Sequence, residues 1–126
     1  MSSQSDPFLA AQSEQKARDE EYFIRGKIVA ICESILAEEI GVIAGSRKLS
    51  SLGLELYGDR DEDFGMFDGV ASETDHLPVD SERANWSGEA LERKDKEIAR
   101  VEAFYKDDVF AGCKKLIEKF HLEGGV

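Results

Sequence analysis

The stretch IRGKIVAICESIL, residues 24–36, decides the fold class of this chain. It contains four isoleucines that follow one another at spacings of four, three and four residues: Ile24, Ile28, Ile31 and Ile35. These spacings place the four side chains on one stripe of an α-helix. The same period continues beyond this stretch to Val42, Leu49, Leu52 and Leu56. The pattern therefore predicts a helix over about residues 13–40 and a second helix over 42–57.

Gly41 separates the two predicted helices. A glycine in the left-handed conformation commonly ends a helix, so Gly41 either ends the first helix or is a weak point in one long bent helix. We favour a break in the chain at this position.

A third apolar face follows Ser87, a residue type that caps helix N-termini well. Apolar side chains recur at helical spacing from there to Phe120, which predicts a helix over about residues 87–121. The opposite face of this helix pairs acidic and basic residues four apart, for example Glu102 and Lys106, as is typical of a solvated face. No segment alternates as a strand would, so we expect an all-α fold with three main helices.

Composition limits the remaining possibilities. The chain has 126 residues with 27 acidic and 16 basic side chains, a net charge of −11. Such a field repels nucleic-acid phosphates and anionic membrane surfaces, and no apolar run approaches the roughly 20 residues of a membrane-spanning helix. We therefore expect neither a nucleic-acid partner nor a membrane partner. The Ser/Gln-rich residues 1–12 are expected to be flexible, and residues 13–126 to form a single helical domain.

The two cysteines and the start of the chain bear on its location. Cys32 and Cys113 each lie on a predicted apolar helix face, where free cysteine commonly behaves as a small buried hydrophobe. The first residues lack the basic and apolar regions of a secretory signal. A reduced, cytoplasmic protein is the simplest expectation, although one bridge between the two cysteines stays open.

Most of the charge is concentrated in residues 59–82. This segment holds nine acidic residues and one basic residue, Arg60, for a net charge of −8. Apolar residues are interleaved with the acids, and Phe64 and Phe67 at helical spacing predict a short helix over about 61–71 that attaches the segment to the core. Carboxylates at this density cannot all be buried. They must face solvent, a cation or a partner.

Calcium and zinc sites are poorly supported by the sequence. Asp59, Asp61 and Asp63 resemble the start of an EF-hand loop, but Phe64 stands where the loop needs glycine and Val70 where it needs glutamate. The histidines and cysteines show no paired spacing of the kind that zinc sites use. We therefore predict no metal ligands and no cofactor.

Nucleic-acid binding and catalysis have partial motifs only. Residues 36–48 resemble a helix-turn-helix, but Arg47 falls where that motif needs a buried aliphatic side chain. Ser72, Asp75 and His76 contain the letters of a hydrolytic triad, yet neighbours in one loop do not easily form the required line of groups. We predict a protein that is not an enzyme and has no catalytic residues.

Recognition of a basic protein is the function that the pattern favours. An acidic surface raises the association rate and specificity for a basic partner, and exposed apolar anchors would supply affinity. The candidate anchors are Phe64, Met66, Phe67 and Trp86, although for each of them a place in the core is the favoured interpretation. The predicted partner-binding carboxylates are Asp61, Glu62, Asp63, Asp68, Glu73 and Asp75. One alternative is a metal-binding or metal-dependent hydrolytic protein that uses the carboxylates of residues 59–75. Another is a homodimer that covers the long apolar stripes.

Four stretches of the chain carry a resemblance: GSRKLSSLGLEL, DEDFGMFDGVASETDHLP, RANWSGEALERKDKEI and CKKLIEKF. Together they resemble a group of small bacterial proteins that includes immunity proteins for delivered toxins. The resemblance implies a cytoplasmic protein that binds one cognate toxin and blocks its active site. Nuclease toxins have basic substrate clefts, which a dense acidic segment would suit. The resemblance covers most of the chain from Gly45 to Phe120.

Overall fold

The computed structural model describes residues 7–122, and within this range the fold is all-α without strands. Its helices are α1 (Pro7–Leu36), α2 (Val42–Tyr57), α3 (Gly65–Glu73) and α4 (Gly88–Leu122). Two 3-10 turns, η1 (Glu62–Phe64) and η2 (Ser81–Asn85), flank α3 on either side. The predicted fold class is confirmed.

The observed helix limits differ from the predicted ones mainly at the start of α1 and in the short helix predicted at 61–71. α2 has the predicted bounds, and α4 is displaced by one residue from the predicted 87–121. α1 begins at Pro7, within the segment assigned to a flexible N-terminus, because proline suits the first turn of a helix. Residues 1–6 of that predicted segment lie outside the described residues. The predicted short helix at 61–71 is a 3-10 turn that continues into α3 as far as Glu73.

The predicted break between the first two helices is confirmed, but Gly41 is not its left-handed residue. α1 ends at Leu36, and Glu38 takes the left-handed conformation with φ of 59°. Gly41 is the N-cap of α2 with φ of −70°. Its side is closed by α4, since a Cβ added to Gly41 would lie 2.5 Å from Oε2 of Glu102. Any larger residue at this position would have to displace the carboxylate of Glu102.

Glu102 completes the N-terminus of α2. Gly41 offers no capping side chain, and Oε2 of Glu102 instead accepts a hydrogen bond from the backbone N–H of Ile43 at 3.0 Å. A carboxylate is favourable there because the first N–H groups of a helix lack partners within the helix. The predicted pairing of Glu102 with Lys106 is wrong, because Lys106 reaches Glu38 on the α1–α2 connection at 2.9 Å.

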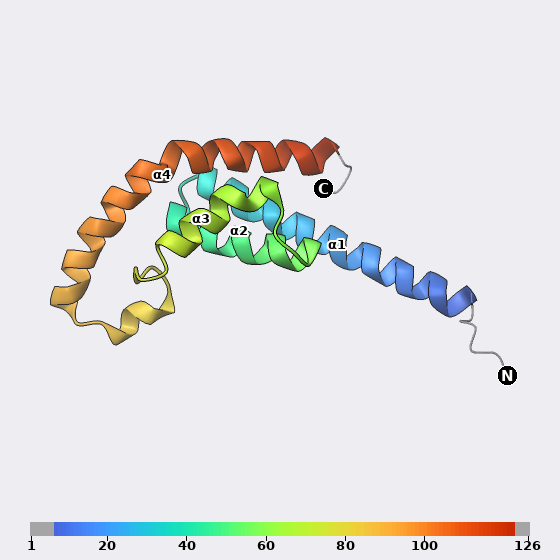
Figure 1. Cartoon of the computed structure of the whole chain (residues 1–126), viewed down its shortest axis with the longest axis horizontal. Coiled ribbons are helices and arrows are strands. Elements are labelled where there is room, and N and C mark those ends of the chain that lie inside the picture. Colours follow the sequence, from blue (N-terminus) through green and yellow to red (C-terminus); the bar gives the residue numbers. More distant parts are fainter. Residues whose placement is uncertain (1–6, 123–126) are drawn as a thin grey trace.

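The core lies where α1, α2, α3 and the second half of α4 meet (Figure 1). Phe64 and Phe67 are almost fully buried in it. Their rings lie so close to Gly53 of α2 and Gly112 of α4 that an added Cβ would come within 2.6 and 2.9 Å of them. The other large buried side chains are Ile28, Ile35, Ile43, Leu49, Val70, Leu77, Val109, Leu116 and Phe120.

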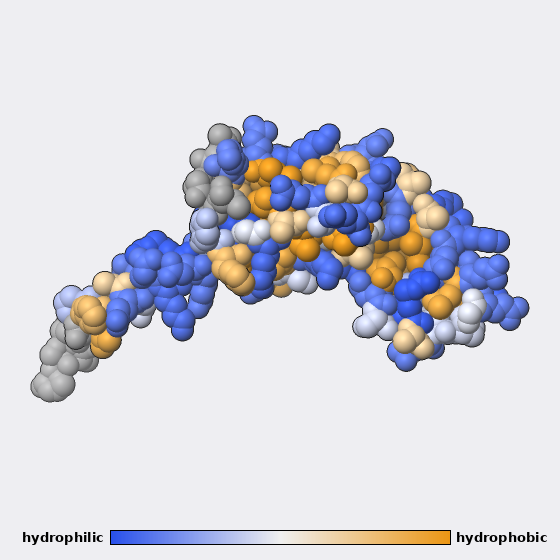
Figure 2. Space-filling view, turned by 180° about the vertical axis from the view of Figure 1, so that it is seen from behind, coloured by the Kyte–Doolittle hydropathy of each residue, from blue (hydrophilic) through white to orange (hydrophobic). Residues whose placement is uncertain are grey.

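Two parts of the chain extend away from this core. The first turns of α1 project from the body (Figure 1), and nearly all of residues 7–23 are exposed. At the other end, the first half of α4 and the preceding segment form a second lobe, and apolar surface gathers where this lobe joins the body (Figure 2). Among the helices of residues 7–122, none combines the length and apolar content needed to cross a membrane.

Arg47 fastens the segment between α3 and α4 to the body. Its guanidinium donates to the backbone carbonyls of Thr74 and Leu77, the latter at 2.9 Å. It also contacts carboxylate oxygens of Asp80 at 3.3 Å and Glu82 at 3.0 Å. Arg47, which does not fit the helix-turn-helix pattern, therefore links two segments of the chain, and its positive charge is paired with carboxylates of the same protein.

Candidate functional site: an acidic groove

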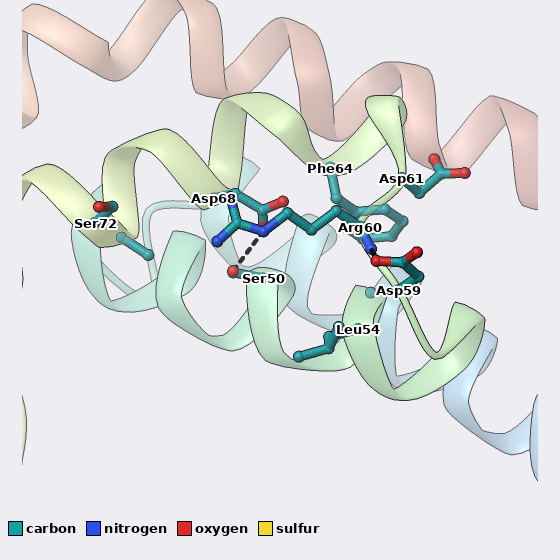
Figure 3. A pocket seen from close by; sticks show the side chains of 10 residues that line it. Ser50, Leu54, Asp59, Arg60, Asp61, Phe64, Asp68 and Ser72 are labelled. Atoms are coloured by element: carbon teal, nitrogen blue, oxygen red, sulfur yellow. Dashed lines mark hydrogen bonds between the residues drawn. The ribbon is translucent and has the colours of Figure 1, made fainter.

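Two adjoining cavities lie between α2, α3 and the turn that joins them, with volumes of about 310 and 460 Å³. They share four lining residues: Arg60, Asp61, Asp68 and Ser72. The first has an apolar floor that includes Leu54 and Phe64 (Figure 3). We call the two together the acidic groove, because its walls carry the carboxylates of Asp59, Asp61, Glu62, Asp68 and Glu73.

The structure brings together four of the six predicted partner-binding residues: Asp61, Glu62, Asp68 and Glu73. They come from the α2–α3 connection and from successive turns of α3. Asp59 joins them as a wall residue that the sequence analysis did not select. The clustering follows from the fold, because α3 packs along α2 and places its polar side next to the connection.

Asp63 and Asp75 do not line the groove. Asp63 points to α4, where its carboxylate lies 2.5 Å from Nζ of Lys119 and 4.0 Å from Nζ of Lys115. Its charge is thus neutralised within the protein, and the Asp63 carboxylate raises the pKa of Lys119. Asp75 is exposed on the turn after α3, with no hydrogen bond or ion pair to another described residue.

Hydrogen bonds from uncharged donors orient most of the groove's carboxylates. Asp61 caps η1 by accepting from the backbone N–H of Asp63 at 2.9 Å. Asp68 accepts from the hydroxyl of Ser50 at 2.5 Å, which ties α3 to α2 (Figure 3). Glu73 accepts from the hydroxyl of Tyr105, and this bond raises the pKa of Tyr105. Neutral donors fix these side chains and leave their negative charge available to a partner.

Arg60 is the one cation that lines the groove. Its side chain extends along the groove from the Asp59 side toward Asp68 (Figure 3), and it forms no ion pair with any residue between 7 and 122. Five carboxylates therefore face a single guanidinium. A concave surface with such an excess of one sign concentrates the field and attracts cations.

The groups that suggested catalysis or metal binding are not assembled. His76 contacts Glu97 at 3.1 Å, and no hydrogen bond links it to Ser72 or Asp75. In the part of the chain that the structure describes, no group of three or more histidine, cysteine, aspartate or glutamate side chains is arranged to hold a metal ion. Ser72, Asp75 and His76 are therefore neighbours in sequence without forming the hydrogen-bonded line that a hydrolytic triad needs.

Cys32 and Cys113 are buried free thiols that meet in the core between α1 and α4. The hydrogen bond with Cys113 and burial both raise the pKa of Cys32, which keeps its thiol protonated. The expectation of small buried hydrophobes is met, and the two thiols are not bridged.

The candidate anchors divide into two groups. Phe64 and Phe67 belong to the core, and only Phe64 borders the groove, as part of its floor. Met66 and Trp86 are 38% and 36% exposed, and Trp86 lies 5.9 Å from Nζ of Lys94. Leu54, exposed on the groove floor, is an anchor that sequence reasoning missed. The sequence places Leu54 on a predicted helix, but its exposure becomes visible only when the position of α3 is known.

Comparison with known proteins finds no matching family model and no significantly similar curated protein or solved structure. The function inferred for the groove therefore rests on its own chemistry.

Proposed function

We propose that this chain is a non-enzymatic binding protein that receives a basic surface of another protein in the acidic groove. The single observation that carries the proposal is the convergence of five carboxylates on one groove with one opposing cation. Because the carboxylates are fixed by neutral hydrogen-bond donors, they are already oriented before binding. Preorganisation lowers the entropic cost of association.

Charge and apolar contact have separate roles in this proposal. The net charge of −8 over residues 59–82 steers a basic partner toward the groove and raises the association rate. The exposed side chain of Leu54, in the lining of the groove, supplies apolar area that holds the partner once it has docked. Asp63 stabilises the fold through its ion pair with Lys119, and the exposed Asp75 adds only to the overall negative potential of the protein.

The specific form of the proposal is a bacterial immunity protein that neutralises a cognate toxin in the cytoplasm. The fit between an acidic groove and the basic substrate cleft of a nuclease toxin supports this form, and the resemblance of residues 45–120 to such proteins stays a prediction from the sequence. Occupation of that cleft by the groove would exclude the toxin's substrate.

A pair of triple variants with equal net charge tests the groove. Asp59→Asn, Glu62→Gln and Glu73→Gln remove three groove charges while keeping side-chain size and acceptor atoms. The control triple changes Glu14, Glu20 and Glu21 on the projecting part of α1 to Gln. The probes are a ten-residue lysine peptide and the basic protein retained from the native host on a column of this chain.

We expect the groove triple to lose at least ten-fold in affinity for both probes at low salt, and the control triple to lose far less. Binding of the unmodified chain should weaken steeply as sodium chloride is raised, because the Debye length shrinks from ~30 Å at 0.01 M to ~10 Å at 0.1 M. Equal losses from the two triples would show that net charge acts without the groove, and the proposal would be wrong.

A further inference from the structure

Phe104 is the most exposed large hydrophobic side chain among residues 7–122, at 75%. It lies on α4, and its ring meets the ring of Tyr105 edge-on at a centroid distance of 5.0 Å. An exposed aromatic ring forgoes the stabilisation that burial would give, about 25 cal/mol per Å² of apolar area. The sequence pattern had placed this residue on the buried face of the last helix, so its exposure is a property of the fold.

A cavity of about 310 Å³ adjoins Phe104 on the same face of the molecule. It lies between α4 and the turn after α3, with Leu77 and Val101 among its apolar walls. Several polar groups around it have partners within the chain: the hydroxyl of Thr74 donates to the carbonyl of Val70, and His76 contacts Glu97. Glu73 accepts from the hydroxyl of Tyr105. Arg100 also lines the cavity and forms no ion pair with any residue between 7 and 122.

The charge around this cavity differs from that of the rest of the protein. The lining of the cavity holds one acidic and one basic side chain, Glu73 and Arg100, which balance each other. α4 as a whole carries eight acidic and eight basic residues, whereas the whole chain has a net charge of −11. A second copy of the chain would be repelled at the acidic groove and by the overall field. It can approach α4 without meeting local repulsion. A strongly basic partner, by contrast, gains nothing at this face.

We propose that two copies of this chain associate through α4, with Phe104 of each copy inserted into the cavity beside Val101 of the other. The projecting ring and the cavity lie on one face of the same molecule. A twofold axis therefore satisfies both contacts at once, as isologous dimer interfaces do. The dimer leaves α2 and the connection that follows it outside the contact, and Glu73 is the residue that lines both this cavity and the acidic groove.

Sedimentation velocity from 1 to 200 µM tests the association. We expect a concentration-dependent dimer that strengthens when sodium chloride is raised from 0.05 to 0.5 M, because salt screens the repulsion between two acidic chains. Phe104→Ser should weaken the dimer by about 100-fold, since two rings are lost per dimer and each buried aromatic anchor contributes more than about ten-fold. The matched control is Phe23→Ser, which removes a 63% exposed ring from α1.

A mixing experiment tests the reciprocal insertion itself. Val101→Trp fills the cavity but keeps the projecting ring, and Phe104→Ser removes the ring but keeps the cavity. Each variant alone should be monomeric, whereas their mixture recovers one of the two contacts and associates measurably. Far-UV circular dichroism of each variant should match that of the unmodified chain, which excludes unfolding as the cause.

Three results would overturn the dimer: a monomer at 200 µM, equal effects of the Phe104 and Phe23 variants, or a mixture no more associated than its components. Loss of the dimer with unchanged binding of the lysine peptide would leave the groove proposal standing. The salt dependence separates the two further, because the peptide binds more weakly at high salt and the dimer more tightly.

Discussion

Replacing Arg47 by alanine is the perturbation for which the structure gives the sharpest expectation. The side chain is 19% exposed and holds the segment after α3 through two backbone carbonyls and two carboxylates. The carbonyl of Thr74 keeps a second partner, the N–H of Leu77, whereas the buried carbonyl of Leu77 would lose its donor. Hydrogen bonds to a charged group contribute about 1.5–3 kcal/mol each.

We estimate a loss of about 3 kcal/mol in the free energy of unfolding for Arg47→Ala. The two bonds to carbonyls account for about that amount. The contacts with Asp80 and Glu82 add little, because both carboxylates are about 40% exposed and screened by solvent. Such a loss is a large part of the 5–15 kcal/mol that stabilises a typical domain.

The assay is urea denaturation at pH 7, followed by circular dichroism and by the fluorescence of Trp86, the only tryptophan. Arg47→Lys should recover only part of the loss, because an ammonium group lacks the fork that reaches several acceptors. Lys48→Ala, a neighbouring exposed substitution, should change stability by less than about 0.5 kcal/mol. A loss below 1 kcal/mol for Arg47→Ala, or full rescue by lysine, would refute the reasoning.

Three other outcomes are expected. Arg83 lowers the pKa of Asp95, so this pair stabilises the fold above the unfolded pKa of about 4, and the stability is lost as pH falls through the lower folded pKa. The urea midpoint of the unmodified chain should therefore decline below about pH 4, and the midpoint of Asp95→Asn should decline less steeply. Glu102→Gln should cost about 1 kcal/mol through its weaker cap on α2, and Gly41→Ala should destabilise by displacing Glu102, both measured by thermal unfolding. Magnesium, calcium or manganese at 5 mM should leave the melting temperature unchanged, whereas a rise would support the metal-binding alternative.

Short-range pattern predicted the helices well because burial against one core imposes a helical period. The isoleucine stripe from Ile24 to Ile35 packs as expected, and α2 has the predicted limits. The start of α1 was missed because residues 7–23 have little tertiary contact and hence no apolar period. Phe64 and Phe67 attach the acidic segment to the core as predicted, whereas Phe104, which the helical period placed on the buried face, is exposed.

The site was predicted in its composition but not in its boundaries. Adjacent carboxylates reach one groove because α3 lies along α2. Asp63 lies outside the groove because it pairs with Lys119, which is 56 residues away in sequence. Glu102 bonds to Ile43, 59 positions away, and Arg47 bonds to Thr74, 27 positions away. Charge patterns within one helix carry no information about such partners, because long-range packing determines them.

The uneven support of α1 has a practical consequence. Residues 24–36 of α1 pack against the core, whereas residues 7–23 form about 25 Å of helix that lies in solvent, at about 1.5 Å per residue. Ordering there depends on local contacts along the helix, such as the hydrogen bonds of Gln15 with Asp19 and Arg18, and an exposed helix end of this kind opens independently of global unfolding. That end of the molecule is accordingly the position at which a dye, an affinity tag or a fused domain can be attached with the least disturbance to the rest.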